Sequence, residues 1–190
     1  MLTNVLYILI FLLYLLQESS WSCLKSSYGA NFAIPRVYRS SGSVDPNGAA
    51  NINDARSAGI AYVDGYIFPC YSCGNAAGQM DDTINSLKAS GIYMLKHNEL
   101  HKEIMKVNRT QTLTSGEHIP VTATAGMIWI DVEGTQYWSS SATNNVNFIQ
   151  EMVTEGEKQG VVIGIYTSNS QWSPICGGST QFSSYPLWYP

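Results

Sequence analysis

The sequence predicts an α/β fold with mostly parallel strands, on three observations. Short apolar segments alternate with amphipathic segments at the spacing of strand–helix–strand units. Glycine follows three of the amphipathic segments, at Gly59, Gly91 and Gly160, where a helix end favours it. The chain has 190 residues and is 45% hydrophobic, which allows one domain with a packed core. This pattern alone does not separate an open sheet from a closed barrel.

The strands are expected where short runs are apolar and rich in β-branched and aromatic residues. These runs are 32–38 (FAIPRVY), 60–68 (IAYVDGYIF), 126–132 (GMIWIDV) and 161–167 (VVIGIYT), and 187–189 is expected to begin another. The helices are expected at 51–58, 79–90 and 143–159. In the second of these, Met80, Ile84 and Leu87 fall on one stripe, as an amphipathic helix requires.

The N-terminus begins with an apolar run at 2–16 (LTNVLYILIFLLYLL), followed by small and polar residues. This order is typical of a secretory signal peptide. We therefore expect a signal peptide at 1–20, a domain at 21–190 and a secreted, extracellular protein without a stable membrane anchor. A short anchor and a buried helix are the alternatives, but a span needs about 20 apolar residues.

Four cysteines, at Cys23, Cys70, Cys73 and Cys176, are an even number. In an oxidising compartment they predict two disulfides with three possible pairings. The CxxC spacing of the central two leaves a thioredoxin-like redox motif or a metal site as alternatives. We expect no metal.

Residues 96–125 do not fit the alternation, since a helix-to-strand connection usually takes two to six residues. This stretch contains all three histidines, and we interpret it as an insertion, a lid or an error in the gene model. His97 and His101 are four residues apart, which favours a solvated helix face over a metal site. Asn108 begins a glycosylation sequon, so this part is expected to be exposed if glycosylated.

The composition also excludes several function classes. A net charge of −4 and a pI near 5.2 disfavour a nucleic-acid-binding face. The sequence contains no phosphate-binding loop or dinucleotide fingerprint, and the histidines offer no dependable base for a catalytic triad. We expect a monomer that uses no cofactor.

Two carboxylates stand at the end of the third predicted strand, in the sequence IWIDVEG. Because side chains alternate along a strand, Asp131 and Glu133 share one face with Trp129, with Cα atoms about 6.6 Å apart. Carboxyl ends of parallel strands are where α/β proteins place their sites. Two acids so close resist joint ionisation, so one of them is expected to keep a proton at neutral pH, as a general acid must. The alternative is a solvated strand end with two ordinary acids.

A third acid, Asp64, shares a face with Tyr62, Tyr66 and Phe68 on the second predicted strand. Acids among aromatic rings are typical of sugar sites, although Asp64 is alternatively a core acid paired with Arg36. Tyr166, Trp172, Trp188 and Tyr189 follow later strands and are candidates for stacking walls or for core positions.

Several blocks occur in a recognisable order: FAIPRVY, AGIAYVDGYIFPC, SCGNAAGQ, GMIWIDVEG, QYW, GVVIGIYTS, QW and YPLWY. Together they resemble glycoside hydrolase family 25 lysozymes of the secreted nematode type, over residues 22–95 and 126–190. The resemblance implies a modified β/α (TIM-like) barrel that cleaves the β-1,4 bond between N-acetylmuramic acid and N-acetylglucosamine in peptidoglycan. Antibacterial defence or digestion would be its role, and peptidoglycan its partner.

The resemblance also assigns roles to single residues. It implies that Glu133 is the general acid and Asp131 its companion, and that Asp64, Tyr66 and Tyr166 line the substrate groove. Arg36 and Trp188 fall near that groove. The family's opening strand, with its active-site Asp, and its last strands are not recognised here, so we expect an incomplete barrel. A catalytically inactive, lectin-like glycan binder is therefore the main alternative, followed by a redox protein and a non-functional fragment.

Overall fold

The computed structural model describes residues 11–12, 15–94 and 124–189. The strands are β1 (Phe11–Leu12), β2 (Phe32–Arg39), β3 (Ser43–Val44), β4 (Tyr62–Val63), β5 (Gly65–Ile67), β6 (Tyr93–Met94), β7 (Thr124–Ala125), β8 (Met127–Asp131), β9 (Val162–Tyr166) and β10 (Leu187–Trp188). The helices are α1 (Glu18–Tyr28), α2 (Gly48–Ser57), α3 (Ala76–Ala89), α5 (Ala142–Lys158) and α6 (Asn169–Cys176), with 3₁₀ turns η1 (Tyr71–Cys73) and η2 (Thr135–Tyr137).

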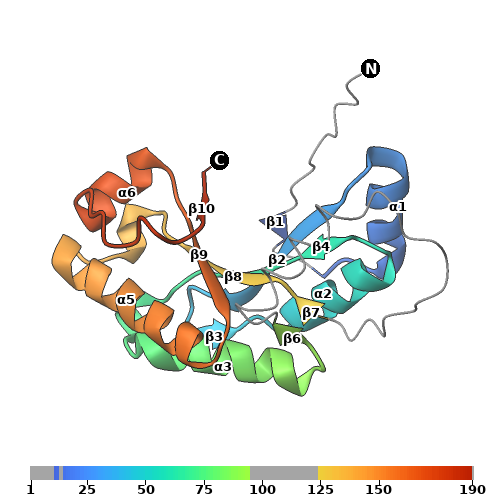
Figure 1. Cartoon of the computed structure of the whole chain (residues 1–190), viewed down its shortest axis with the longest axis horizontal. Helices are drawn as coiled ribbons and strands as arrows, with labels where there is room; N and C mark the ends of the chain where they lie inside the picture. Colours follow the sequence, from blue (N-terminus) through green and yellow to red (C-terminus); the bar gives the residue numbers. More distant parts are fainter. Residues whose placement is uncertain (1–10, 13–14, 95–123, 190) are drawn as a thin grey trace.

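The main sheet is parallel along its whole path, in the order β1-β2-β5-β8-β9-β10. The short strands β3 and β4 also pair with β2, and β3 is antiparallel to it. Within the described ranges no strand joins β10 back to β1, so the sheet is an open, curved one (Figure 1). The predicted α/β class and the incomplete barrel are confirmed.

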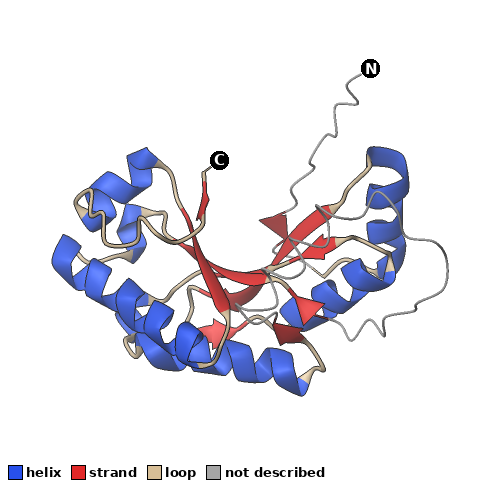
Figure 2. Ribbon diagram, viewed as in Figure 1, coloured by secondary structure: helices blue, strands red, loops and turns tan. Residues whose placement is uncertain are grey.

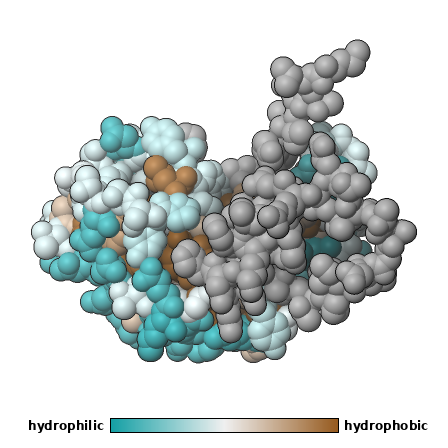
Figure 3. All heavy atoms as spheres, in the orientation of Figure 1, coloured by the Kyte–Doolittle hydropathy of each residue, from teal (hydrophilic) through white to brown (hydrophobic). Residues whose placement is uncertain are grey.

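The sheet has two different faces. Helices α2, α3 and α5 follow its convex side, while the concave side carries no helix at its centre (Figure 2). The large core lies under the helices, where Ile128, Ile130 and Val132 of the β8 segment are fully buried. On the helix-covered outside, hydrophilic side chains gather over α3 and α5 (Figure 3).

The three predicted helices are present, with α2 beginning three residues before its predicted start. Helices α1 and α6 were not among the elements predicted by periodicity, since α1 begins within the expected signal peptide and α6 has only eight residues with Pro174 inside it. The predicted strand at 60–68 is interrupted: β4 ends before Asp64 and β5 begins after it. The interruption places the Asp64 backbone N–H against the Ala33 carbonyl at 2.9 Å.

The structure describes part of the N-terminal segment on both sides of the expected boundary at residue 20. Phe11 and Leu12 pair with Ile34 and Pro35 of β2, and α1 begins at Glu18. Trp21, in the first turns of α1, is fully buried in the core. The expected boundary therefore falls inside a helix that packs with the domain. A short first strand is also present, although it carries no acidic residue.

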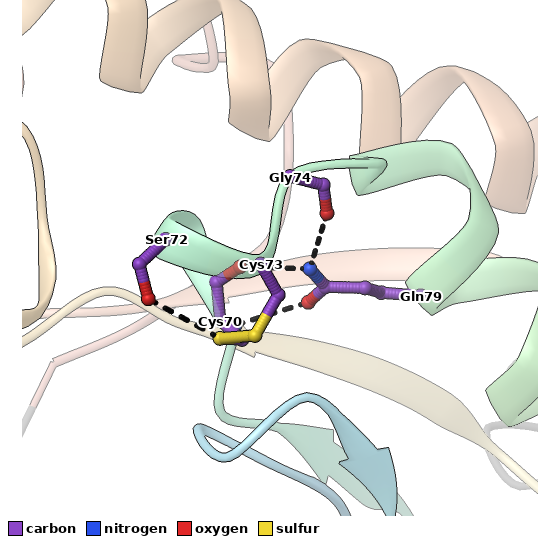
Figure 4. The surroundings of a disulfide bond; sticks show 5 residues. All are labelled: Cys70, Ser72, Cys73, Gly74 and Gln79. Atoms are coloured by element: carbon purple, nitrogen blue, oxygen red, sulfur yellow. Dashed lines mark hydrogen bonds between the residues drawn. A yellow bond between two sulfur atoms is a disulfide. The ribbon is translucent and has the colours of Figure 1, made fainter.

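One disulfide is formed, between Cys70 and Cys73 in η1 (Figure 4). The side chain of Gln79 reaches back from α3 and fixes this turn: its amide donates to the carbonyls of Cys70 and Gly74, each at 2.8 Å. Cys23 and Cys176 are free, the first exposed and the second buried. The expectation of two disulfides is therefore wrong, because the remaining cysteines lie on α1 and α6, at opposite ends of the sheet.

The expected insertion at 96–125, with its histidines and the Asn108 sequon, lies almost entirely outside the described residues. Its last two residues form β7, which pairs in parallel with β6. In the part of the chain that the structure describes, no helix is long and apolar enough to cross a membrane. Those same residues contain no cluster of three or more metal-binding side chains.

Candidate active site

The parallel register aligns the predicted site residues in two rows across the sheet. Arg36 of β2 lies opposite Tyr66 of β5, which lies opposite Trp129 of β8. Two residues further along β8, Asp131 lies opposite Tyr166 of β9, and Tyr166 lies opposite Trp188 of β10. Residues opposite one another in a sheet point to the same face. These six side chains therefore share the concave face, away from the helices.

Asp131 is the last residue of β8 and is only 2% exposed. Burial, with the charge of Glu133 added to it, raises the pKa of Asp131 to about 8. Its Oδ1 is buried and has no hydrogen-bond partner within the described structure. In neutral solution the acid pair therefore holds a proton on Asp131, with a carboxyl oxygen available for a new partner.

Glu133 is half-buried, two residues beyond Asp131, at the point where the strand has ended. Its backbone is held in place, since its carbonyl accepts a hydrogen bond from the Trp138 indole at 3.0 Å. The next amide, of Gly134, donates to the Gln171 side chain at 2.8 Å. Glu133 is more exposed than Asp131, so a ligand reaches it first. The two hydrogen bonds hold the backbone on either side of its carbonyl.

Aromatic rings stand beside the acids on this face. Trp188 packs edge-on against Tyr166, with centroids 4.6 Å apart, and against Trp129 at 5.7 Å. Burial and then the charges of Glu133 and Asp131 raise the pKa of Tyr166, so its hydroxyl remains a hydrogen-bond donor at neutral pH. Burial also raises the pKa of Tyr66. The site thus combines ring faces with neutral hydroxyl groups, a combination that suits sugars.

Arg36 forms an ion pair with Asp45, with 2.7 Å between Nε and Oδ2. Asp45 is buried and also accepts from the Asn47 backbone at 3.0 Å. The alternative pairing of Arg36 with Asp64 is therefore wrong. Sequence reasoning missed Asp45 because it lies in the connection after β3, outside any periodic segment.

Asp64 does not join the acid pair. It lies next to Gly65, which is opposite Ile128, so it sits at the beginning of β8 and not at its end. Four residues of strand, or about 13 Å, separate that level from Asp131. Its carboxylate accepts from the Trp129 indole at 2.8 Å and from the Met127 amide at 2.9 Å. Both oxygens of Asp64 are thus engaged by β8, and its role in substrate binding stays a prediction.

Trp172 and Tyr189, two of the predicted stacking residues, line a separate cavity of about 410 Å³ with Phe182 and Tyr185. Ile165 lines that cavity too, whereas its neighbour Tyr166 points to the acid face. Because adjacent strand residues face opposite sides, this cavity is on the convex side of β9. These two rings are therefore not walls of the acid site.

The acid pair thus lies at the carboxyl end of a central parallel strand, flanked by aromatic rings on an open half-barrel, which is where α/β barrels place their active sites. A family model described as lysozyme-like protein 1 matches residues 10–97 and 108–190. The chain belongs to this lysozyme-like family, of the glycoside hydrolase family 25 type, and the resemblance seen in the sequence is confirmed.

The relatives and solved structures agree with this assignment. Probable GH family 25 lysozyme 2 of Dictyostelium discoideum is 43% identical over 170 residues, covering 90% of this chain and 65% of the relative. Lysozyme-like protein 5 of Caenorhabditis elegans is 34% identical over 177 residues, covering 92% and 67%. The chain thus spans about two thirds of the length of these relatives.

Among solved structures, a muramidase from Acremonium alcalophilum matches with a TM-score of 0.65 at 18% identity, covering 96% of this chain and 75% of that one. A family GH25 lysozyme from Aspergillus fumigatus matches with a TM-score of 0.59 at 19% identity, covering 91% and 71%. These two matches show the fold.

Proposed function

We propose that this chain is a lysozyme-like glycoside hydrolase that cleaves the β-1,4 bond between N-acetylmuramic acid and N-acetylglucosamine in bacterial peptidoglycan. The observation that carries the proposal is the pairing of Asp131, whose burial raises its pKa to about 8, with the half-buried Glu133 at the end of β8. The solved muramidases share its fold, and the curated relatives are named lysozymes.

The two acids have different parts in this proposal. Glu133 is placed to protonate the leaving glycosidic oxygen, because it is the acid that a sugar reaches first. The proton that it gives is the one that the pair holds on Asp131: it passes to Glu133 before the step, and Asp131 is then the carboxylate. Asp131 holds the proton of the pair at neutral pH and has an oxygen without a partner, which suits a hydrogen bond to the substrate's acetamido group. Tyr166 and Trp188 offer the adjoining rings as a platform for the sugar.

The second candidate is a lectin-like protein that binds the glycan but does not cleave it. Glycosidases use two carboxylates flanking the scissile bond. Here β1 carries no acid, and the carboxylates of Asp64 and Asp45 are engaged by Trp129 and Arg36, which leaves the Asp131–Glu133 pair on the described face. That observation favours binding without cleavage, and the two functions share every other feature of the site.

Clearing of bacterial cell walls separates the candidates. For a hydrolase, we expect the chain to clear a wall suspension and Glu133→Gln to reduce the rate by at least about 100-fold, the usual contribution of a general acid. Glu151→Gln, an exposed change on α5, is the matched control and should clear at the wild-type rate. Sedimentation with insoluble walls, without clearing, would favour the lectin-like candidate.

Secretion, and with it a role in antibacterial defence or digestion, belongs to the same proposal. The apolar run at 2–16 and the disulfide in η1 support an oxidising, extracytoplasmic location. N-terminal sequencing of protein recovered from the medium of expressing cells tests this. A processed N-terminus near residue 20 is expected, which would remove β1 and the first three residues of α1 and keep the buried Trp21. Retention of Met1 in an intracellular fraction would contradict it.

A further inference from the structure

We propose that Asp64 is a positioning residue: its buried carboxylate holds the Trp129 indole, and so fixes the row of rings that borders the acid pair. For its effect on sugar binding this inference rests on the proposed function. The placement of the rings can be tested without it. Asp64 is a buried carboxylate that the proposed chemistry leaves unused.

The carboxylate of Asp64 is engaged on both oxygens. Oδ2 accepts from the Trp129 indole at 2.8 Å, and Oδ1 accepts from the Met127 amide at 2.9 Å. Both donors belong to β8, whereas Asp64 lies in the break between β4 and β5. The acid is only 6% exposed, and burial raises its pKa while these hydrogen bonds and the Arg56 charge lower it. A carboxylate in such a place needs its partners, because an unpaired buried charge is costly.

The Trp129 ring is confined from a second side by Gly164. This glycine lies opposite Trp129 on β9, and a Cβ added to it would come within 2.6 Å of the indole carbons Cζ3 and Cε3. The six-membered ring therefore lies over the glycine while the Nε1 edge is tied to Asp64. With both edges held, the indole has one position on the concave face.

A chain of ring contacts connects Trp129 to the acid site. Trp129 meets Trp188 at 5.7 Å with the ring planes at 74°, and Trp188 meets Tyr166 at 4.6 Å and 65°. Tyr166 is the residue opposite Asp131 in the sheet. Edge-to-face pairs have a preferred geometry, so a displaced Trp129 would let Trp188 and then Tyr166 shift. Asp64 thus acts on the site from about 13 Å along the strand, without touching a substrate.

The chemistry explains why an acid serves here. A carboxylate presents two acceptor oxygens, one for the indole and one for the amide. An asparagine side chain has one acceptor oxygen and two N–H donors, so one of the two β8 donors would lose its partner. Asp64→Asn is therefore a shape-preserving change that loosens the hold on Trp129.

The test uses three variants of the full chain: Asp64→Asn, Trp129→Phe and the exposed-acid control Asp82→Asn. The first readout is the set of indole N–H signals in a ¹H–¹⁵N NMR spectrum, one for each of the five tryptophans. We expect Asp64→Asn to move the signals of Trp129 and Trp188. Trp129→Phe, which identifies the Trp129 signal by its loss, should also move that of Trp188, and Asp82→Asn should move neither.

The second readout is the Kd for an N-acetylglucosamine tetramer. Asp64→Asn and Trp129→Phe should each weaken binding about five- to tenfold, the equivalent of one hydrogen bond. The double variant should be no weaker than either single one, because both remove the same contact. Glu133→Gln, which lies outside the ring row, should leave the Trp129 and Trp188 signals in place.

The outcomes are distinct. If Asp64→Asn lowers only the melting temperature while the Trp188 signal and the Kd stay as in the wild type, Asp64 is merely a core acid and the inference is overturned. If Asp64→Asn does not fold, an unmoved Trp188 signal in Trp129→Phe overturns it equally. If the wild type binds no tetramer, the proposed function loses support, while the NMR signals still decide the positioning role.

Discussion

Replacing Asp131 by asparagine should stabilise the folded chain in neutral and alkaline solution. The carboxyl is 2% exposed, and burial with the neighbouring Glu133 charge raises its pKa from 3.8 to about 8. Below about pH 4 the group is protonated in both the folded and the unfolded chain. As the pH rises from there to about 8, the unfolded chain gives up the proton while the folded chain keeps it, so folding becomes progressively less favourable.

The size of the effect follows from the difference in proton affinity. Each tenfold change in affinity is worth about 1.4 kcal/mol, so the interval from 3.8 to about 8 corresponds to roughly 6 kcal/mol lost by pH 8. The asparagine amide also needs partners in a site where Oδ1 has none, which offsets about 1–3 kcal/mol. A net gain of about 3–5 kcal/mol is expected for Asp131→Asn at pH 8.

Urea unfolding between pH 4 and pH 9 measures this directly. The free energy of unfolding of the wild type, minus that of Asp131→Asn, should fall by up to about 1.4 kcal/mol per pH unit between about pH 4 and pH 8. Taking the difference cancels the other titrating groups, including Asp64. Asp82→Asn, on the exposed surface of α3, should show no such trend.

Two results would refute the reasoning. A constant difference across the whole pH range would mean that Asp131 titrates like an exposed acid. An Asp131→Asn variant less stable than the wild type at pH 8 would mean that the carboxylate is stabilised by a partner. In either case Asp131 would not hold a proton in neutral solution, and the proposed chemistry depends on that proton.

Two further predictions concern stability. Arg36→Met should cost about 3–5 kcal/mol in urea unfolding, because it leaves the buried Asp45 carboxylate without its cation; adding Asp45→Asn should recover much of that loss, and strict additivity would count against a coupled pair. Replacing Cys70 and Cys73 together by serine should lower the free energy of unfolding by about 2 kcal/mol, as closing so short a loop implies. Cys23→Ser, at an exposed free cysteine, is the control and should change nothing.

The sequence was sufficient for the class of fold and for the acid pair. The strand that carries Asp131 alternates apolar side chains with Trp129 and the acids, and that alternation fixes which residues share a face before any partner strand is known. The helices α3 and α5 followed from their stripes and the glycines after them. These are local properties, set by the spacing of a few neighbouring residues.

The positions of Asp64 and Phe11 were decided by tertiary structure. Asp64 has the same aromatic neighbours in sequence as a sugar-binding acid, yet its carboxylate accepts from the Trp129 indole of β8, a strand more than 60 residues away in the sequence. Phe11 lies in the apolar run that predicts a signal peptide, and its pairing with Ile34 at the sheet edge is not visible in that run.

The pairing of the cysteines was also decided by tertiary structure. Their even number predicted two disulfides, and one is formed. Pattern and composition describe what a segment tends to do alone. Register and pairing depend on which distant segment lies beside it, and that is settled only when the whole sheet is assembled.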